Sequence, residues 1–281
     1  MKKVLTMGIG GTGDLIQACQ VAHFIKQKVG YDNVEVVCLA RDETFEPIKL
    51  LFGDQLRISQ HPLKELWGEG YKLITDPIIL KEEKLKYDEI VVVAPDLLFR
   101  AGEYSFNFEK YGCSPQSVVQ KRLLEHKFAP EKIVYCAFAN TTTKGYQYEQ
   151  TKQLIELLAT ILPDYKFYVP VLLTWNNESI LNSDKNAELK NFPKNVLVDV
   201  NPTWERALTF MSKSCYGICL DSAPMHLFFQ YGIGRLILDP RFGHDRNSLP
   251  WVARWRAGLG LHDSISINTN HEAVAGVVFT N

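Results

Sequence analysis

Four glycines and a carboxylate follow the first apolar run of the chain, in the sequence GIGGTGD at residues 8–14. Glycine allows positive φ angles and a close approach of backbone to ligand, and a helix N-terminus favours a negative group. Gly8, Gly10 and Gly13 match the spacing GxGxxG, which binds the pyrophosphate of a dinucleotide when it links a strand to a helix. Asp14, however, would repel that pyrophosphate. Two interpretations of this turn therefore compete.

In one interpretation Asp14 is itself the anion at the helix N-terminus, ionised, fixed and facing a cleft. A carboxylate in this position suits a general base, which takes a proton from a reacting hydroxyl group. A helix-capping aspartate without a chemical role is the alternative. In the other interpretation the glycines bind NADP, and Arg41 at the end of the next strand contacts its 2′-phosphate. That interpretation predicts an NADP-dependent oxidoreductase.

A polar loop, NTTTKGYQ at residues 140–147, follows the first strand of the second half of the chain. The hydroxyl groups of Thr141, Thr142 and Thr143 can donate hydrogen bonds, and Lys144 adds a positive charge. Such a loop can hold a phosphate, although it lacks the GxxxxGK[ST] pattern of a P-loop. An ordinary polar turn with a solvated lysine is the alternative.

The third candidate is the segment CLDSAPMHLFFQYG at residues 219–232. Asp221 and Ser222 end a strand, Pro224 suits the first turn of a helix, and His226 falls one turn in. With Ser222 as the cap, the start of this helix presents backbone N–H groups to an anion. His226 could also donate to a phosphate or a sugar, whereas a buried structural histidine is the alternative.

Strand and helix signals alternate along the chain, and the apolar runs of the strands are continuous rather than alternating. This pattern predicts parallel sheets covered on both faces, in two Rossmann-like domains at residues 1–130 and 131–281. Ligands of such sheets bind beyond the carboxyl ends of the strands. The expected strands are 4–9, 34–40, 89–94, 132–139, 166–173, 195–200, 216–220 and 235–239, and the main helices are 14–28, 46–53, 116–128, 148–162, 203–214 and 224–232.

The composition of the chain argues against nucleic-acid binding, metal binding and a membrane span. A net charge of −1 over 281 residues provides no general field for nucleic acid, so we expect no nucleic-acid partner. The six cysteines are scattered without a CxxC pair, which predicts reduced, mostly buried thiols and no zinc site or other metal site. No apolar segment approaches the ~20 residues of a membrane span. We therefore expect a cytoplasmic protein.

The order of GGTGD at the first helix, a polar loop with a lysine, and DSAPMH before a late helix resembles the heptosyltransferases of glycosyltransferase family 9. The resemblance covers nearly the whole chain. It implies the GT-B fold, in which two Rossmann-like α/β domains with parallel sheets face each other. It also implies an inverting transferase of lipopolysaccharide biosynthesis that needs no metal or cofactor. ADP-heptose would be the donor and a glycan or glycolipid the acceptor, with peripheral contact at the inner face of the membrane.

The resemblance also implies roles for individual residues. Asp14 resembles the catalytic base, in an acceptor-side loop formed by Gly10, Gly11, Thr12 and Gly13. On the donor side, the implied binding residues are Thr141, Thr142, Thr143, Lys144, Glu178, Asp221, Ser222, Ala223 and His226. Among these, Lys144 and the threonines resemble the loop that binds the donor phosphate. The turn that binds the diphosphate is matched by Ser222, Ala223 and His226, and Asp221 resembles the acid that shapes this turn. Glu178 resembles a ligand of the nucleotide ribose.

The sequence departs from the family pattern at Ala223, where glycine is usual, and at Tyr146, where Lys-Trp-Pro is commoner in the lysine loop. The chain is also short in its first domain. These departures leave a third interpretation, a non-catalytic nucleotide-sugar-binding protein of the same fold.

Overall fold

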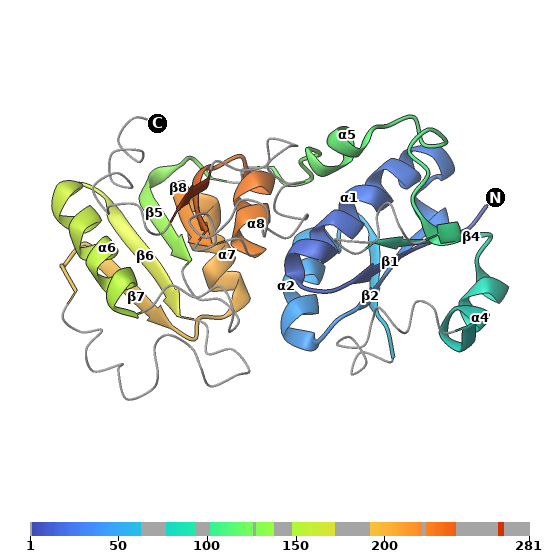
Figure 1. Cartoon of the computed structure of the whole chain (residues 1–281), viewed down its shortest axis with the longest axis horizontal. Helices are drawn as coiled ribbons and strands as arrows, with labels where there is room; N and C mark the ends of the chain where they lie inside the picture. The colour runs from blue at the N-terminus through green and yellow to red at the C-terminus, as the bar shows by residue number, and fades with distance from the viewer. Residues whose placement is uncertain are drawn as a thin grey trace. The chain divides into compact units, whose positions relative to one another are not determined.

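The computed structural model describes residues 2–62, 77–93, 102–125, 128–137, 148–171, 192–220, 223–239 and 264–266. It is an α/β protein with two parallel sheets (Figure 1). The chain divides into two compact units, Met1–Leu124 and Glu125–Asn281. This division lies a few residues before the domain boundary expected after residue 130.

Unit 1 holds a sheet in the order β3-β2-β1-β4, with every neighbouring pair parallel. The strands are β1 (Val4–Ile9), β2 (Val34–Leu39), β3 (Arg57–Gln60) and β4 (Glu89–Val93). Every residue of β1 is buried, as the continuous apolar run predicts for a central strand. Leu5, Met7 and Ile9 form one core with residues of β2, β4 and α4.

The helices of unit 1 are α1 (Thr12–Val29), α2 (Asp42–Phe52), α4 (Pro77–Lys86) and α5 (Pro115–Val119), with 3₁₀ turns η1 (Tyr31–Asn33) and η3 (Gly102–Tyr104). Helix α1 packs on β1 and β2 and contacts α2 and α5. It begins two residues before the expected start at Asp14. The expected helix 46–53 forms the second half of α2.

The helix expected over residues 116–128 is wrong beyond its first four residues, because α5 ends at Val119. The side-chain amide of Gln20 donates to the backbone carbonyls of Val119 and Lys121, at 2.9 and 2.8 Å. The amide of Gln55 donates to the carbonyl of Leu123 at 3.0 Å. A longer helix would need these carbonyls as acceptors for its own N–H groups, so the two glutamines hold the segment in a non-helical path.

Unit 2 holds a sheet in the order β10-β9-β8-β5-β6-β7, again parallel throughout. The strands are β5 (Glu131–Ala137), β6 (Lys166–Val171), β7 (Val196–Val200), β8 (Ser214–Leu220), β9 (Gly234–Asp239) and β10 (Ser264–Ser266), and the helices are α6 (Tyr148–Ile161), α7 (Trp204–Lys213) and α8 (Ala223–Tyr231). Apolar residues of α6 pack on β5, β6 and β8 to form the core. The elements expected in this half are therefore present, and β10 is an addition.

All six cysteines are free thiols, and four of them are buried. Within the described ranges, no group of three or more histidine, cysteine or acidic side chains is arranged to hold a metal ion. None of the described helices is long and apolar enough to cross a membrane.

Candidate functional site

The glycine turn lies between the carboxyl end of β1 and the start of α1. Gly10 has a φ of 124°, a backbone conformation that residues with a Cβ rarely adopt. A Cβ on Gly10 would also overlap the carboxylate oxygen Oδ2 of Asp14. The turn therefore needs glycine at position 10 to accommodate the Asp14 side chain.

Asp14 is the third residue of α1, and its carboxylate folds back over the start of the helix. Its Oδ2 accepts a hydrogen bond from the backbone N–H of Gly11 at 2.9 Å. The backbone N–H of Asp14 in turn donates to the carbonyl of Gly11 at 2.9 Å. The structure thus shows Asp14 as a helix-capping residue, half-buried at the carboxyl end of β1. This capping role does not by itself decide whether Asp14 also acts as a base.

Gly8 has a packing role. A Cβ at this position would come within 2.9 Å of the side chains of Leu15 and Ala18, so glycine allows α1 to lie directly on β1. Close packing at Gly8 and the cap at Gly10 and Gly11 account for these three glycines without a bound nucleotide. Arg41, the residue that the NADP interpretation needs, is the N-cap of α2.

Gln17, one turn further along α1 than Asp14, is a residue that the sequence interpretation missed. It is 2% exposed, and neither its Nε2 nor its Oε1 has a hydrogen-bond partner in the part of the chain that the structure describes. Asp14, Gln17 and Gln20 follow each other at intervals of three, so they share one side of the helix. This polar row among the apolar residues of α1 is the signal that could have marked Gln17 as a candidate.

The two loops predicted to bind the donor follow neighbouring strands of unit 2. Strand β5 ends at Ala137 and β8 at Leu220, and Ala137 is paired with Cys219 in the parallel register. The loop after β5 leads to α6, and the short one after β8 leads directly to α8. Thr141, Thr142, Thr143, Lys144, Glu178, Asp221 and Ser222 themselves lie outside the described residues.

Ala223 and His226 are the described members of the donor-side set. Ala223 is the first residue of α8, and His226 is its fourth, 8% exposed and flanked by buried apolar residues. Helix α8 lies close on β8, because a Cβ at Gly217 would come within 2.5 Å of the Phe228 ring. The burial of His226 agrees with the alternative of a buried structural histidine. The first turn of α8 follows directly after the end of β8.

No protein-family model matches the sequence, and no curated protein sequence matches it significantly. Solved structures do match. E. coli heptosyltransferase WaaC with ADP is 12% identical, with a TM-score of 0.61 over 99% of this chain and 97% of WaaC. E. coli ADP-heptose lps heptosyltransferase II is 12% identical, with a TM-score of 0.58 over 99% of this chain and 98% of its own.

A glycosyl transferase family 9 protein from Veillonella parvula DSM 2008 is 11% identical and has a TM-score of 0.56, over 100% of this chain and 91% of its own. The chain has the GT-B fold. The expected fold class, α/β with two parallel Rossmann-like sheets, is confirmed. Within this GT-B chain, Asp14 lies at the carboxyl end of β1 in unit 1, and the loops predicted to bind the donor follow β5 and β8 in unit 2.

Proposed function

We propose that the chain is an inverting, metal-independent glycosyltransferase that moves a sugar from a nucleoside diphosphate to a hydroxyl group of a glycan or glycolipid. The GT-B fold shared with heptosyltransferases supports this assignment, and Asp14 supplies the group that such a reaction needs. The finer proposal is a heptose from ADP-heptose. Its support is that WaaC, a similar structure, was solved with ADP and with ADP-2-deoxy-2-fluoro heptose.

The placement of Asp14 is the single observation that carries the proposal. A carboxylate bound to the Gly11 N–H at the start of α1 is stabilised by the helix dipole and held in one position. A pyrophosphate at the same helix end would meet this negative charge, so unit 1 suits a neutral hydroxyl group better than a dinucleotide. This argument favours the transferase over the NADP-dependent oxidoreductase.

In the proposed reaction Asp14 takes the proton of the acceptor hydroxyl while the hydroxyl oxygen attacks the anomeric carbon of the donor sugar. The bond between that carbon and the diphosphate oxygen breaks on the opposite face, so the configuration inverts. The nucleoside diphosphate leaves with the bonding electrons. Lys144, the start of α8 after Ser222, and His226 stabilise the negative charge that develops on it.

The test is a product assay with ADP-heptose and a lipopolysaccharide fragment that lacks its heptoses, read by mass spectrometry of the acceptor. Calorimetry with ADP, UDP, GDP and NADP accompanies it. Heptose transfer together with ADP binding supports the proposal. Binding of NADP and not of the diphosphates would contradict it, and ADP binding without transfer to any acceptor would indicate the non-catalytic alternative.

A further inference from the structure

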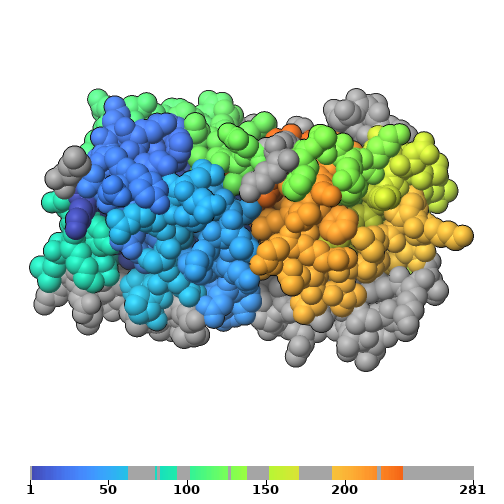
Figure 2. Space-filling model, turned by 180° about the vertical axis from the view of Figure 1, so that it is seen from behind, coloured from blue at the N-terminus to red at the C-terminus, as the bar shows by residue number. Residues whose placement is uncertain are grey.

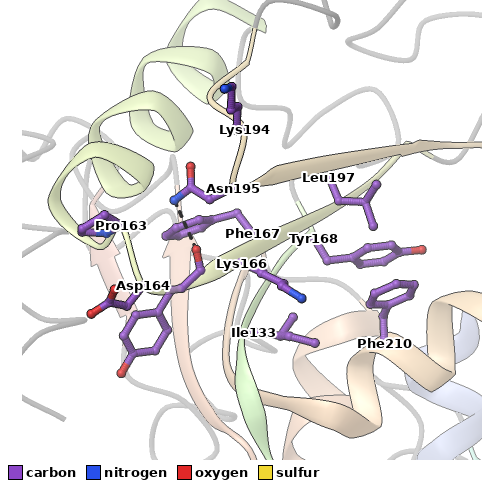
Figure 3. A pocket seen from close by; sticks show the side chains of 11 residues that line it. Ile133, Pro163, Asp164, Lys166, Phe167, Tyr168, Lys194, Asn195, Leu197 and Phe210 are labelled. Carbon is purple, nitrogen blue, oxygen red and sulfur yellow. Dashed lines mark hydrogen bonds between the residues drawn. The ribbon is translucent and has the colours of Figure 1, made fainter.

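A pocket of about 390 Å³ opens in unit 2 at the amino ends of β5, β6 and β7 (Figure 3). Of the lining residues, Lys166 is the first residue of β6, Asn195 directly precedes β7, and Ile133 is the third residue of β5. The proposed donor loops follow the opposite, carboxyl ends of strands in this sheet. The pocket is therefore a second site, separate from the donor site.

One side of the pocket is aromatic and apolar. The rings of Tyr168 on β6 and Phe210 on α7 stack with centroids 4.0 Å apart and planes inclined by 7°. Leu197 is the register partner of Tyr168 on β7 and is 42% exposed. Figure 3 shows Leu197, Tyr168 and Phe210 gathered on one side, and Figure 2 shows the surface of α7 (orange) open on one face of the molecule. Tyr168 is only 1% exposed and supports Phe210, so half-buried Phe210 and exposed Leu197 form the apolar surface that a ligand ring could contact.

The rim of the pocket is positively charged. Lys166 and Lys194 line it, are exposed, and have no carboxylate partner among the residues that the structure describes. Lys132 lies close to the same rim, with its Nζ 5.8 Å from the centre of the Tyr165 ring. Asp164 is the one acidic residue of the lining. Positive charge therefore exceeds negative charge around the opening.

The carboxylate of Asp199, which contacts the lining residue Tyr168, does not offset this charge. Its Oδ2 accepts the hydroxyl group of Tyr168 at 2.8 Å and is paired with the guanidinium of Arg206. These contacts hold Asp199 on β7 and position the Tyr168 ring against Phe210. The Arg206 guanidinium also lies over the Phe210 ring, 5.6 Å from its centre. These contacts therefore hold the rings of Tyr168 and Phe210 in place before any ligand binds.

We propose that this pocket binds a small planar aromatic molecule that carries one acidic group. The ring lies against Phe210 and Leu197, and the carboxylate, sulfonate or phosphate group faces Lys166 and Lys194. The volume lies at the lower end of the ~300–1,000 Å³ of small-molecule sites, which limits the ligand to a few rings. Charge complementarity selects an anion over a neutral aromatic compound.

The probe is 1-anilinonaphthalene-8-sulfonate, an aromatic sulfonate whose fluorescence rises in apolar sites. It is titrated into the full-length protein with ADP present to occupy the proposed donor site. Lys194→Glu and Leu197→Ser are expected to weaken dye binding by about tenfold each, or about 1.4 kcal/mol. Lys49→Glu and Leu50→Ser are the matched controls, because both residues are exposed on α2 of unit 1, Leu50 at 46%.

N-phenyl-1-naphthylamine, the same ring system without the sulfonate, tests the charge. It is expected to bind the wild-type protein about tenfold more weakly than the sulfonate. Equal binding of the two dyes, equal binding by the Lys194→Glu or Leu197→Ser variant and the controls, or no fluorescence change with the wild type would each overturn the proposal. None of these readouts depends on glycosyl transfer, so the result stands apart from that of the transferase assay.

Discussion

The carboxylate of Asp14 accepts the backbone N–H of Gly11 at 2.9 Å and so closes the first turn of α1 with a side chain that also carries the proposed chemistry. A carboxylate that accepts one backbone hydrogen bond keeps further lone pairs with which it can take up a proton. Capping and catalysis are therefore compatible at this residue, and they can be separated by substitution.

Asp14→Asn and Asp14→Ala separate the two roles. An asparagine oxygen can still accept the Gly11 N–H but cannot act as a base, whereas alanine removes both functions. We expect both variants to lose at least ~10²-fold in transfer rate. Only Asp14→Ala should also lose about 1 kcal/mol in the free energy of unfolding, the usual loss for removing a cap. Urea denaturation and the product assay measure the two effects, and full turnover by Asp14→Asn would reject Asp14 as the base.

Gly10→Ala tests whether the turn positions the carboxylate. A Cβ at Gly10 would overlap Asp14 Oδ2, in addition to the unfavourable φ of 124°. Gly102→Ala is the matched control, because Gly102 also has a positive φ, 60°, but no atom within 4 Å of the added Cβ. We expect Gly102→Ala to lose roughly 1–2 kcal/mol from backbone strain alone.

Gly10→Ala should lose more stability than this control and should lower the transfer rate, because the added methyl group displaces the carboxylate. Gly102→Ala should leave the transfer rate unchanged. The measurements are thermal unfolding and turnover of both variants. Equal losses of stability with normal turnover in both would show that Gly10 does not position Asp14.

The sequence predicted the parallel sheets well, because buried parallel strands consist of continuous apolar runs such as 4–9 and 132–137. It missed β3, whose residues RISQ are mostly polar and only partly buried. It extended α5 too far, because the amides that end it lie 99 and 68 positions away in the sequence, at Gln20 and Gln55. Local periodicity contains no information about such distant partners.

For the site, the spacing of the glycines was sufficient to place Asp14 at the start of a helix, and the capping alternative followed from residue type alone. The polar row of α1 could have marked Gln17 as a candidate residue, but it could not predict that Gln17 is buried, because the same row could equally have faced solvent. The roles of Lys144, Ser222 and the other donor-side loop residues stay predictions, since those residues lie outside the described part of the chain.

Gln17→Leu should stabilise the protein. The Gln17 amide is buried, with no partner for either polar atom among the described residues, and each such group costs roughly 1–3 kcal/mol. Gln20→Leu is the matched control on the same helix, and it should destabilise by a similar amount because it leaves the carbonyls of Val119 and Lys121 without their donor. Urea denaturation at one pH gives both values. A loss for Gln17→Leu as large as that for Gln20→Leu would contradict the assignment.

Glu89 predicts a pH dependence of stability. Burial opposes its ionisation, yet hydrogen bonds from Lys110, Lys2 and Tyr111 together hold its pKa below the ordinary value. A carboxyl group whose pKa is lower in the folded state than in the unfolded state adds stability above the unfolded value, ~4.3 for glutamate. That stability is lost as the pH falls through the lower folded pKa.

Glu89→Gln should therefore lower the free energy of unfolding by about 1 kcal/mol at pH 7, and the difference from wild type should vanish as the pH falls below about 4. The control is Glu103→Gln, because the Glu103 side chain is 69% exposed in its pair with Lys84, compared with 17% for Glu89. Solvent screens that exposed pair, so its removal should change stability less at every pH. Chemical denaturation from pH 7 to pH 3 measures both variants. A difference for Glu89→Gln that persists unchanged at pH 3 would show that the side chain acts through packing and not through its charge.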